Sequence, residues 1–230
     1  AVIHKEYHLS SADPAIVGVE HSKPVGATNF NVADQLADIG MEAIHPKASK
    51  PLEVAGINIR IKNTFEPDHP GTLISNEYRG EVSRVEIISG TDRVMAIEVH
   101  DPHMVGQVGY DLNLMKVIQR HQISYILKAT NANSITMVYW EKDLSEALIT
   151  ELKGLYFKVT IKEAAMVCAM GTNITYPGSL AKASAALFEA GVNVEAVSQS
   201  LMQVNMQFVI SRKDYHQGIR ALNQALCLDD

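Results

Sequence analysis

The sequence predicts a mixed α/β protein in which two copies of one small unit follow an amino-terminal part of different construction. Three observations lead to this prediction. Six of the eight prolines lie in residues 1–75. After about residue 80, the order strand, helix, strand, strand, helix occurs twice. Identical residues recur between the two copies at offsets of 69 or 71 positions, as Gly109 and Gly178 do.

The amino-terminal part contains few regular patterns. Residues 31–39 place apolar side chains at helical spacing, and Gly40 stands where a glycine ends a helix. Residues 57–61 alternate between apolar and polar side chains, which predicts a half-buried strand, and residues 68–71 have the composition of a turn. We therefore expect one clear helix and one clear strand in this part.

The two copies contain the same elements in the same order. In the first copy we expect strands at residues 94–99, 123–127 and 134–140, a helix within 103–121 and a helix at 143–152. In the second copy we expect strands at residues 166–170, 192–197 and 203–210 and helices at 179–190 and 214–226. Two helices on one antiparallel sheet make each copy a ferredoxin-like, split βαβ unit, an α/β (α+β) arrangement. Because a unit of about 70 residues is marginal alone, and edge strands pair readily, we expect a homodimer.

The composition is that of a globular protein, with 47% hydrophobic and 20% charged residues in a chain of 230. The net charge of −6 and the lack of a basic stripe argue against nucleic-acid binding. The longest apolar run, residues 164–170, is far shorter than the about 20 residues of a membrane-spanning helix, so we expect no membrane partner. Two distant cysteines, Cys168 and Cys227, suit a reducing cytoplasm.

The loop at residues 101–109 is a candidate ligand site. Its glycines let backbone N–H groups approach a ligand, and the helix that follows favours a small carboxylate, such as that of an amino acid. A flexible connector explains the same residues, and both interpretations stay open at this point. Residues 171–178 form the counterpart loop in the second copy.

Other kinds of site find no support in the residue pattern. His100 and His103 lie beside Asp101, but no Cys lies nearby and surface histidines at a strand end are the commoner case, so we expect no metal site. Cys168 and Cys227 have no activating partner in the sequence, and no glycine-rich phosphate-binding motif occurs. The residues alone therefore predict no complete catalytic site.

Three segments, however, resemble the aspartokinase family. Residues 59–74 (Ile-Arg-Ile-Lys-Asn-Thr-Phe-Glu-Pro-Asp-His-Pro-Gly-Thr-Leu-Ile) resemble the end of its kinase domain, and residues 40–47 (Gly-Met-Glu-Ala-Ile-His-Pro-Lys) its Gly-Ala-Lys-Val-Leu-His-Pro-Arg stretch. Residues 11–14 (Ser-Ala-Asp-Pro) resemble its nucleotide turn. The resemblance covers essentially the whole chain. It implies a remnant of an amino-acid-kinase α/β domain at residues 1–75, followed by tandem ferredoxin-like βαββαβ ACT domains at 80–160 and 161–230.

The resemblance also implies a function. The parent protein would phosphorylate L-aspartate with MgATP to 4-phospho-L-aspartate, in the biosynthesis of lysine and the other aspartate-family amino acids. The chain begins at Ala1 without Met and lacks the family's Lys-Phe-Gly-Gly motif, so we expect a regulatory fragment. We expect this fragment to have no catalytic residue, no kinase activity alone and no tightly bound ATP or Mg²⁺. A stand-alone amino-acid-binding or structural dimerisation protein of the ACT type is the alternative.

Carried over residue by residue, the resemblance assigns two sites. The residues matching the nucleotide site are Ser10, Asp13 and Pro14. The residues matching the amino-acid effector site are His103, Met104, Val105, Gly106, Gln107, Thr130 and Asn131. Three positions depart from the family pattern: Ser10 replaces a Tyr, Glu42 a nucleotide-binding Lys, and Ile126 an Asp that pairs with the effector's ammonium group. We therefore expect weakened feedback, as in the ectoine-pathway subgroup that the chain resembles, and a dimer interface on the second copy near Val204.

Overall fold

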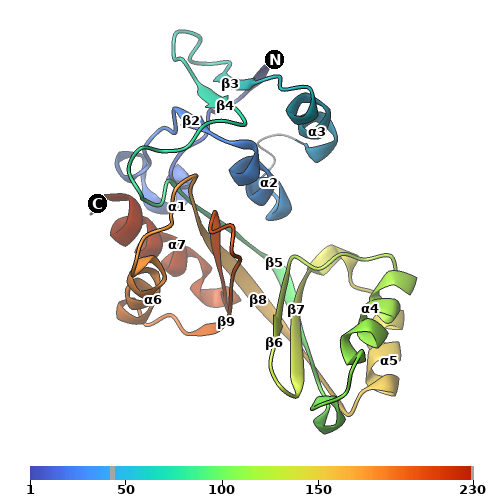
Figure 1. Ribbon diagram of the computed structural model, residues 1–230. Coiled ribbons are helices and arrows are strands. Elements are labelled where there is room, and N and C mark those ends of the chain that lie inside the picture. Colours follow the sequence, from blue (N-terminus) through green and yellow to red (C-terminus); the bar gives the residue numbers. More distant parts are fainter. Residues whose placement is uncertain (42–44, 229–230) are drawn as a thin grey trace.

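The computed structural model describes residues 1–41 and 45–228. It consists of two parts that are joined by a linker, residues 75–86, between β4 and β5 (Figure 1). The amino-terminal part, blue to cyan, contains a four-stranded sheet, and the carboxyl-terminal part, green to red, contains a six-stranded sheet. The predicted mixed α/β class is confirmed. Glu42, at which the resemblance indicated a replaced lysine, lies outside the described residues.

The described residues of the amino-terminal part form a small sheet and three α-helices. Its strands are β1 (Val2–Lys5), β2 (Ala27–Thr28), β3 (Ile59–Asn63) and β4 (Thr72–Ile74). Its helices are α1 (Pro14–Val17), α2 (Phe30–Asp38) and α3 (Pro46–Val54), with the 3-10 turn η1 (Val19–His21). In the strand order β1-β3-β4-β2, only β3 and β4 pair antiparallel.

Helix α2 confirms the helix expected at residues 31–39. Its amino terminus is capped by Asn29, whose Oδ1 accepts a hydrogen bond from the Val32 N–H at 3.1 Å. After its carboxyl end, Gly40 has a φ of +80°, the left-handed conformation that glycine adopts without strain.

Helix α3 is missing from the sequence-based expectation. Its two prolines argue against a helix, yet Pro46 occupies the first turn, where its missing N–H costs nothing, while Pro51 lies inside. The expected strand at residues 57–61 is observed two residues later, as β3. In the turn expected at 68–71, Gly71 has a φ of +73°, and a Cβ there would lie 2.1 Å from the Ile61 carbonyl oxygen.

The carboxyl-terminal part is one antiparallel sheet with four helices. Its strands are β5 (Ile87–His100), β6 (Leu127–Thr130), β7 (Ser134–Trp140), β8 (Lys158–Met170), β9 (Val194–Gln199) and β10 (Asn205–Ser211). Its helices are α4 (Tyr110–Arg120), α5 (Glu146–Leu155), α6 (Ser179–Glu189) and α7 (Tyr215–Asn223). Short turns are η2 (Pro102–Met104), η3 (Glu141–Asp143), η4 (Arg212–Asp214) and the π-helical η5 (Gln224–Leu228).

Two long strands are shared between the two units. In the strand order β6-β7-β5-β8-β10-β9, the second half of β5 and the first half of β8 pair beside β7, and their other halves pair beside β10. The register of β5 against β8 shifts between Thr91 and Val94. We call β6, β7 and the adjoining halves of β5 and β8, with α4 and α5, the first unit. The second unit comprises the other halves with β9, β10, α6 and α7.

The predicted division at residues 80–160 and 161–230 stays a prediction, and the strand pairing adds one feature to it. Residues 87–91, which precede the whole first unit, pair with residues 166–170 of the second unit. Each unit consequently has four strands, and β5 and β8 run continuously through both units. The sequence predicted three strands in each copy and did not show that β5 and β8 belong to both units, because the pairing joins residues far apart in the chain.

Several expected strand limits differ from the observed ones. The strand expected at 166–170 extends back to Lys158, because the apolar run marks only the fully buried half of β8. The strand expected at 123–127 is observed as β6, from Leu127. Val204, near which we expected an exposed dimer interface, is only 8% exposed and precedes β10. The substitution Val204→Asp would therefore disturb folding and would not be a clean test of dimer formation.

The two parts of the chain pack together. One buried apolar cluster contains Leu36 of α2 and Met166 of β8. At its edge, Asn205 Nδ2 donates a hydrogen bond to Gln35 Oε1 at 2.9 Å. Helix α1 also lies against α7. The amino-terminal part therefore packs against the second unit and against the shared strands β5 and β8 (Figure 1).

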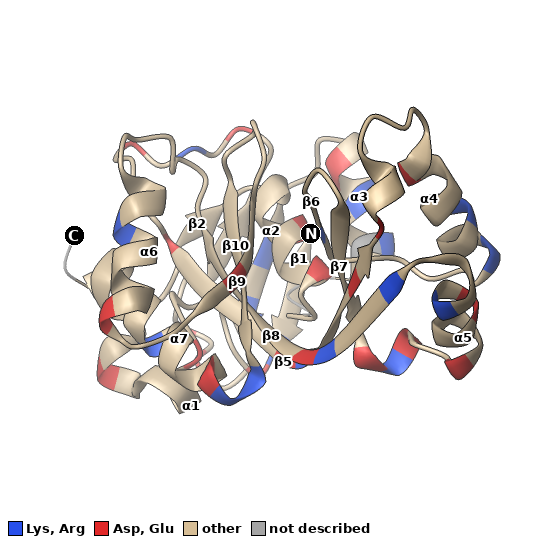
Figure 2. Cartoon of the chain, turned by 90° about the horizontal axis from the view of Figure 1, so that it is seen from below, with Lys and Arg blue, Asp and Glu red and all other residues tan. Residues whose placement is uncertain are grey.

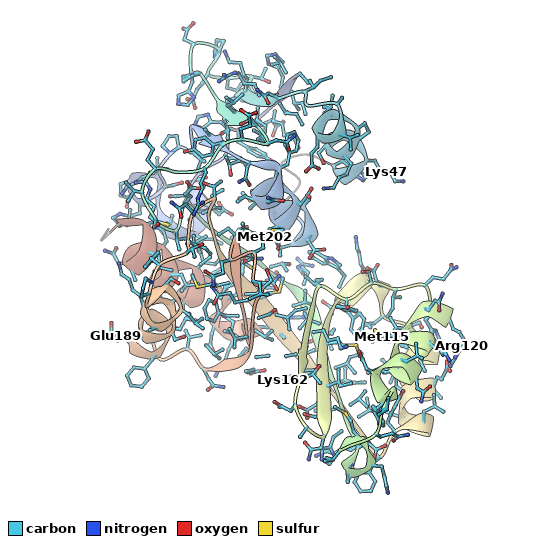
Figure 3. All side chains as sticks on the ribbon, in the orientation of Figure 1. Lys47, Met115, Arg120, Lys162, Glu189 and Met202 are labelled. Carbon is cyan, nitrogen blue, oxygen red and sulfur yellow. The ribbon has the colours of Figure 1, made fainter. Side chains whose placement is uncertain are left out.

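The six-stranded sheet is strongly curved. Its first and last strands, β6 and β9, lie side by side, and Lys162 of β8, labelled in Figure 3, forms an ion pair with Glu195 of β9. Basic and acidic residues are interspersed along the elements of this part (Figure 2). Among the described residues, no helix combines the length and apolar character that crossing a bilayer requires.

Candidate functional site

The three residues predicted for the nucleotide site line one pocket. Ser10, Asp13 and Pro14 contribute to a pocket of about 580 Å³ at the start of α1. The Asp13 carboxylate caps α1 by accepting the Ala15 N–H at 2.9 Å, and Pro14 occupies the first helical position. Ser10 Oγ donates to the Ala12 carbonyl at 2.8 Å. Hydrogen bonds within the turn before α1 thus bring Ser10, Asp13 and Pro14 to the same pocket.

Side chains that the sequence did not indicate complete this pocket. Its further lining residues are Tyr7, His8, Val19, Ser22, Pro24, Met41, Asn63 and Glu66. Asn63 Nδ2 donates to Glu66 Oε1 at 3.0 Å. Asn63 is the last residue of β3 and Glu66 follows it, far from residue 10 in sequence, so the parallel pairing of β1 with β3 brings them near.

A pair of stacked imidazole rings lies at the same pocket. The His8 and His69 rings are stacked with centroids 4.0 Å apart. Burial lowers the pKa of His8, and the neighbouring His69 lowers it further. The neutral form of His8 is thereby favoured. With Tyr7 it provides aromatic wall area of the kind that accommodates a planar ring.

The predicted effector loop is ordered by Asp101. Asp101 Oδ1 accepts the His103 backbone N–H at 2.9 Å, and Oδ2 accepts the Tyr110 hydroxyl at 2.9 Å. The His103 N–H is the main reason that the pKa of Asp101 is lowered. Gly106 and Gly109 adopt positive φ angles of 75° and 79°, which explains the glycines in this loop.

The two groups of predicted effector residues lie at the same end of the first unit. β5 and β6 are both antiparallel to β7. They therefore run in the same direction, and their carboxyl ends lie at the same end of the sheet. The Asp101 N–H bonds to the Asn133 carbonyl at 3.0 Å, which ties the loop to the turn after Thr130 and Asn131. His103, Val105, Gln107, Thr130 and Asn131 are exposed, and Met104 is half-buried.

Position 126 is aliphatic and buried. Ile126 is 9% exposed and belongs to the apolar cluster that also contains Val138. Its N–H donates to the Val138 carbonyl at 2.8 Å. The side chain thus packs as a core residue, and it offers no acceptor to an ammonium group.

The other titratable groups that the sequence singled out have structural roles. Cys168 is fully buried, and burial raises the pKa of its thiol. His103 Nδ1 lies 2.9 Å from Asp101 Oδ1. Within residues 1–41 and 45–228, no three His, Cys, Asp or Glu side chains gather as metal ligands.

Comparison with known proteins extends over both parts of the chain. A family profile described as the ACT domain matches residues 167–226. Aspartate kinase Ask_Ect of Stutzerimonas stutzeri is 46% identical over 98% of this chain. The chain is therefore similar in sequence to aspartate kinases over almost its whole length. Aspartokinase 1 of Arabidopsis thaliana chloroplasts is 26% identical over 94% of the chain. The chain spans about half the length of these relatives, 48% and 39% respectively.

Solved aspartate kinases share the fold. The Clostridium acetobutylicum enzyme superimposes with a TM-score of 0.84 at 22% identity, over 98% of this chain and 53% of that one. Escherichia coli aspartokinase III, solved with aspartate and ADP, gives 0.84 at 20% identity over 95% and 50%. The regulatory subunit from Thermus flavus gives 0.53 over 62% of this chain and 98% of that subunit.

Proposed function

We propose that this chain is the regulatory part of a cytoplasmic aspartate kinase, whose full-length form transfers phosphate from MgATP to L-aspartate in the biosynthesis of lysine and related amino acids. The observation that carries this proposal is the 46% identity to the Stutzerimonas enzyme across 98% of the chain. We assign residues 1–75 to the kinase domain, and residues 80–160 and 161–230 to two ACT domains. Ectoine-pathway membership follows from the resemblance to that subgroup.

The amino-terminal pocket suits the nucleoside end of a nucleotide. The Asp13 and Glu66 carboxylates and the Ser10 hydroxyl offer hydrogen-bonding partners for ribose hydroxyls, beside the aromatic wall of Tyr7 and His8. The described lining residues include neither Lys nor Arg, which a triphosphate requires. We infer that phosphate and Mg²⁺ binding needs residues beyond the described lining of this pocket, and that the chain alone is inactive.

A chimaeric enzyme tests the kinase assignment. Residues 1–230 replace the matching segment of the Stutzerimonas enzyme, and aspartate-dependent ADP formation is measured. We expect activity from the chimaera and none from the chain alone. Ser10→Ala and Asp13→Asn, which keeps an N-cap residue at position 13, should each raise KM for ATP by about tenfold, the effect of losing one polar contact. Asp143→Asn in η3 is the control and should leave KM unchanged.

The result can contradict the assignment in two ways. A folded chimaera without activity would argue against a kinase function for residues 1–75. Aspartate-dependent turnover by the isolated chain would argue against the inferred inactivity.

We infer that the first unit binds a small amino-acid effector and that the ACT domains form a homodimer. The exposed loop at residues 103–107 and the pair Thr130 and Asn131 at the same sheet edge support this inference. Ile126 leaves the ammonium group without a buried carboxylate partner, so we expect weak feedback inhibition. A structural dimerisation module is the second candidate, favoured by the same residue.

Thermal unfolding with lysine, threonine and methionine separates these two candidates. An amino acid present at about 100 times its Kd adds about 2.7 kcal/mol, which raises Tm by roughly 5–10 °C. The double variant Thr130→Ala/Asn131→Ala should lose this shift, whereas Thr150→Ala on the exposed surface of α5 should keep it. Unchanged Tm with every amino acid would favour the structural module.

A further inference from the structure

The linker between the two parts is bonded to the second unit over several residues. Gly80 N donates to Thr172 Oγ1 at 2.9 Å, and Asn173 Nδ2 donates to the Gly80 carbonyl at 2.9 Å. Arg84 N donates to the Asn173 carbonyl at 2.9 Å. These contacts lie at the start of the loop Gly171–Gly178, the counterpart of the predicted effector loop of the first unit.

A carboxylate stands at the centre of this contact. Glu86 Oε2 accepts the Thr172 backbone N–H at 3.0 Å, and Glu86 Oε1 accepts the Thr172 hydroxyl at 3.1 Å. Glu86 is half-buried and Thr172 is buried, so water competes little for these charge-assisted bonds. A Cβ on Gly80 would lie 2.9 Å from Glu86 Oε1, which shows how closely the linker backbone encloses the carboxylate.

The corresponding N–H group of the first unit also binds a carboxylate. Thr172 and His103 are related by the same offset, 69 positions, as Gly178 and Gly109. The His103 N–H donates to Asp101 Oδ1 at 2.9 Å. In the first unit the carboxylate comes from the loop itself, whereas in the second unit it comes from a residue 86 positions earlier.

We propose that the loop Gly171–Gly178 is a carboxylate-binding site whose resident ligand is Glu86, so that the second unit holds the linker in place. The other end of this segment is also held, because Asn29 Nδ2 at the start of α2 donates to the Tyr78 carbonyl at 3.1 Å. The second unit is thereby connected to α2 through the linker. This inference does not depend on the kinase assignment.

Limited digestion with trypsin tests the tether, because Arg79 and Arg84 lie within the linker. Cleavage after these two residues is followed by mass spectrometry. We expect Glu86→Ala to be cut about tenfold faster than the wild type, which corresponds to the loss of one charge-assisted hydrogen-bonded pair. The control Glu81→Ala alters an exposed carboxylate of the same linker and should leave the rate unchanged. Equal rates for Glu86→Ala and the wild type would overturn the tether.

Chemical rescue tests the carboxylate site itself. Sodium acetate, which matches the carboxymethyl group that alanine lacks, should slow the cleavage of Glu86→Ala relative to sodium chloride at equal ionic strength, and should not affect the wild type. Adding Thr172→Val, which removes the hydroxyl and keeps the backbone N–H, should weaken the rescue. A folded Glu86→Ala variant without rescue would overturn the site. If Glu86→Ala does not fold, Thr172→Val alone must show the accelerated cleavage, and a wild-type rate there would also overturn the proposal.

Discussion

Replacing Gly90 by alanine is expected to lower the free energy of unfolding by about 3 kcal/mol. Gly90 lies in β5 where this strand pairs with β8. A Cβ there would lie 2.2 Å from the Met166 carbonyl oxygen and 3.1 Å from Tyr215 Cε2. Because the nearest obstacle is backbone, no side-chain rotation relieves the overlap, and the two shared strands must separate. In a chain of this length the loss lowers Tm by about 10 °C, which calorimetry measures.

Gly154→Ala is the matched control for this substitution. Gly154 lies in α5, and a Cβ there would meet nothing within 4 Å. Alanine is the better helix former, so this variant should gain a few tenths to about 1 kcal/mol. An unchanged Tm for Gly90→Ala would show that β5 and β8 do not pair as closely as described.

Arg212→Ala is expected to lose about 2 kcal/mol, because Arg212 joins the two units. It follows β10 of the second unit, and its Nη2 donates to the Val94 carbonyl at 3.0 Å and to Glu141 Oε2 at 3.2 Å. Its Nη1 lies 3.5 Å from Glu163 Oε1. The side chain is 26% exposed, so solvent screens these interactions only in part.

Urea denaturation of three variants checks this role. Arg93→Ala removes a side chain that is 79% exposed and pairs only loosely with Asp92, so it should cost less than about 0.5 kcal/mol. Arg212→Lys should lose an intermediate amount of free energy of unfolding, since one ammonium group cannot reproduce all the hydrogen bonds that the planar guanidinium donates. Equal losses for Arg93→Ala and Arg212→Ala would contradict the role of Arg212.

Local signals predicted the elements whose determinants are close in sequence. Helix α2 combines apolar spacing with Asn29 before it and Gly40 after it, and all three are visible in one short stretch. The duplication was visible because glycines and turn residues recur at constant offsets. Helix α3 was missed, because its prolines argue against a helix even though Pro46 occupies a position that tolerates proline.

Non-local pairing accounts for the rest of the fold. The two halves of β5 pair in different units, and nothing in residues 87–100 signals which partner each half takes. The polar first half of β8 is a strand because its neighbours hydrogen-bond to it, although its apolar run begins only at Ala164. Ladder hydrogen bonds depend on the partner strand, which a single strand's composition does not encode.

The same distinction between local signals and non-local contacts applies to the predicted sites. Ser10, Asp13 and Pro14 are neighbours in sequence, so the turn that starts α1 is enough to bring them to one pocket. The resemblance to aspartokinases likewise rests on short contiguous segments. Glu66 reaches that pocket, and Glu86 reaches Thr172, only through the folded chain. Contacts between residues tens of positions apart depend on how sheets and loops close in space, and only the tertiary structure contains that information.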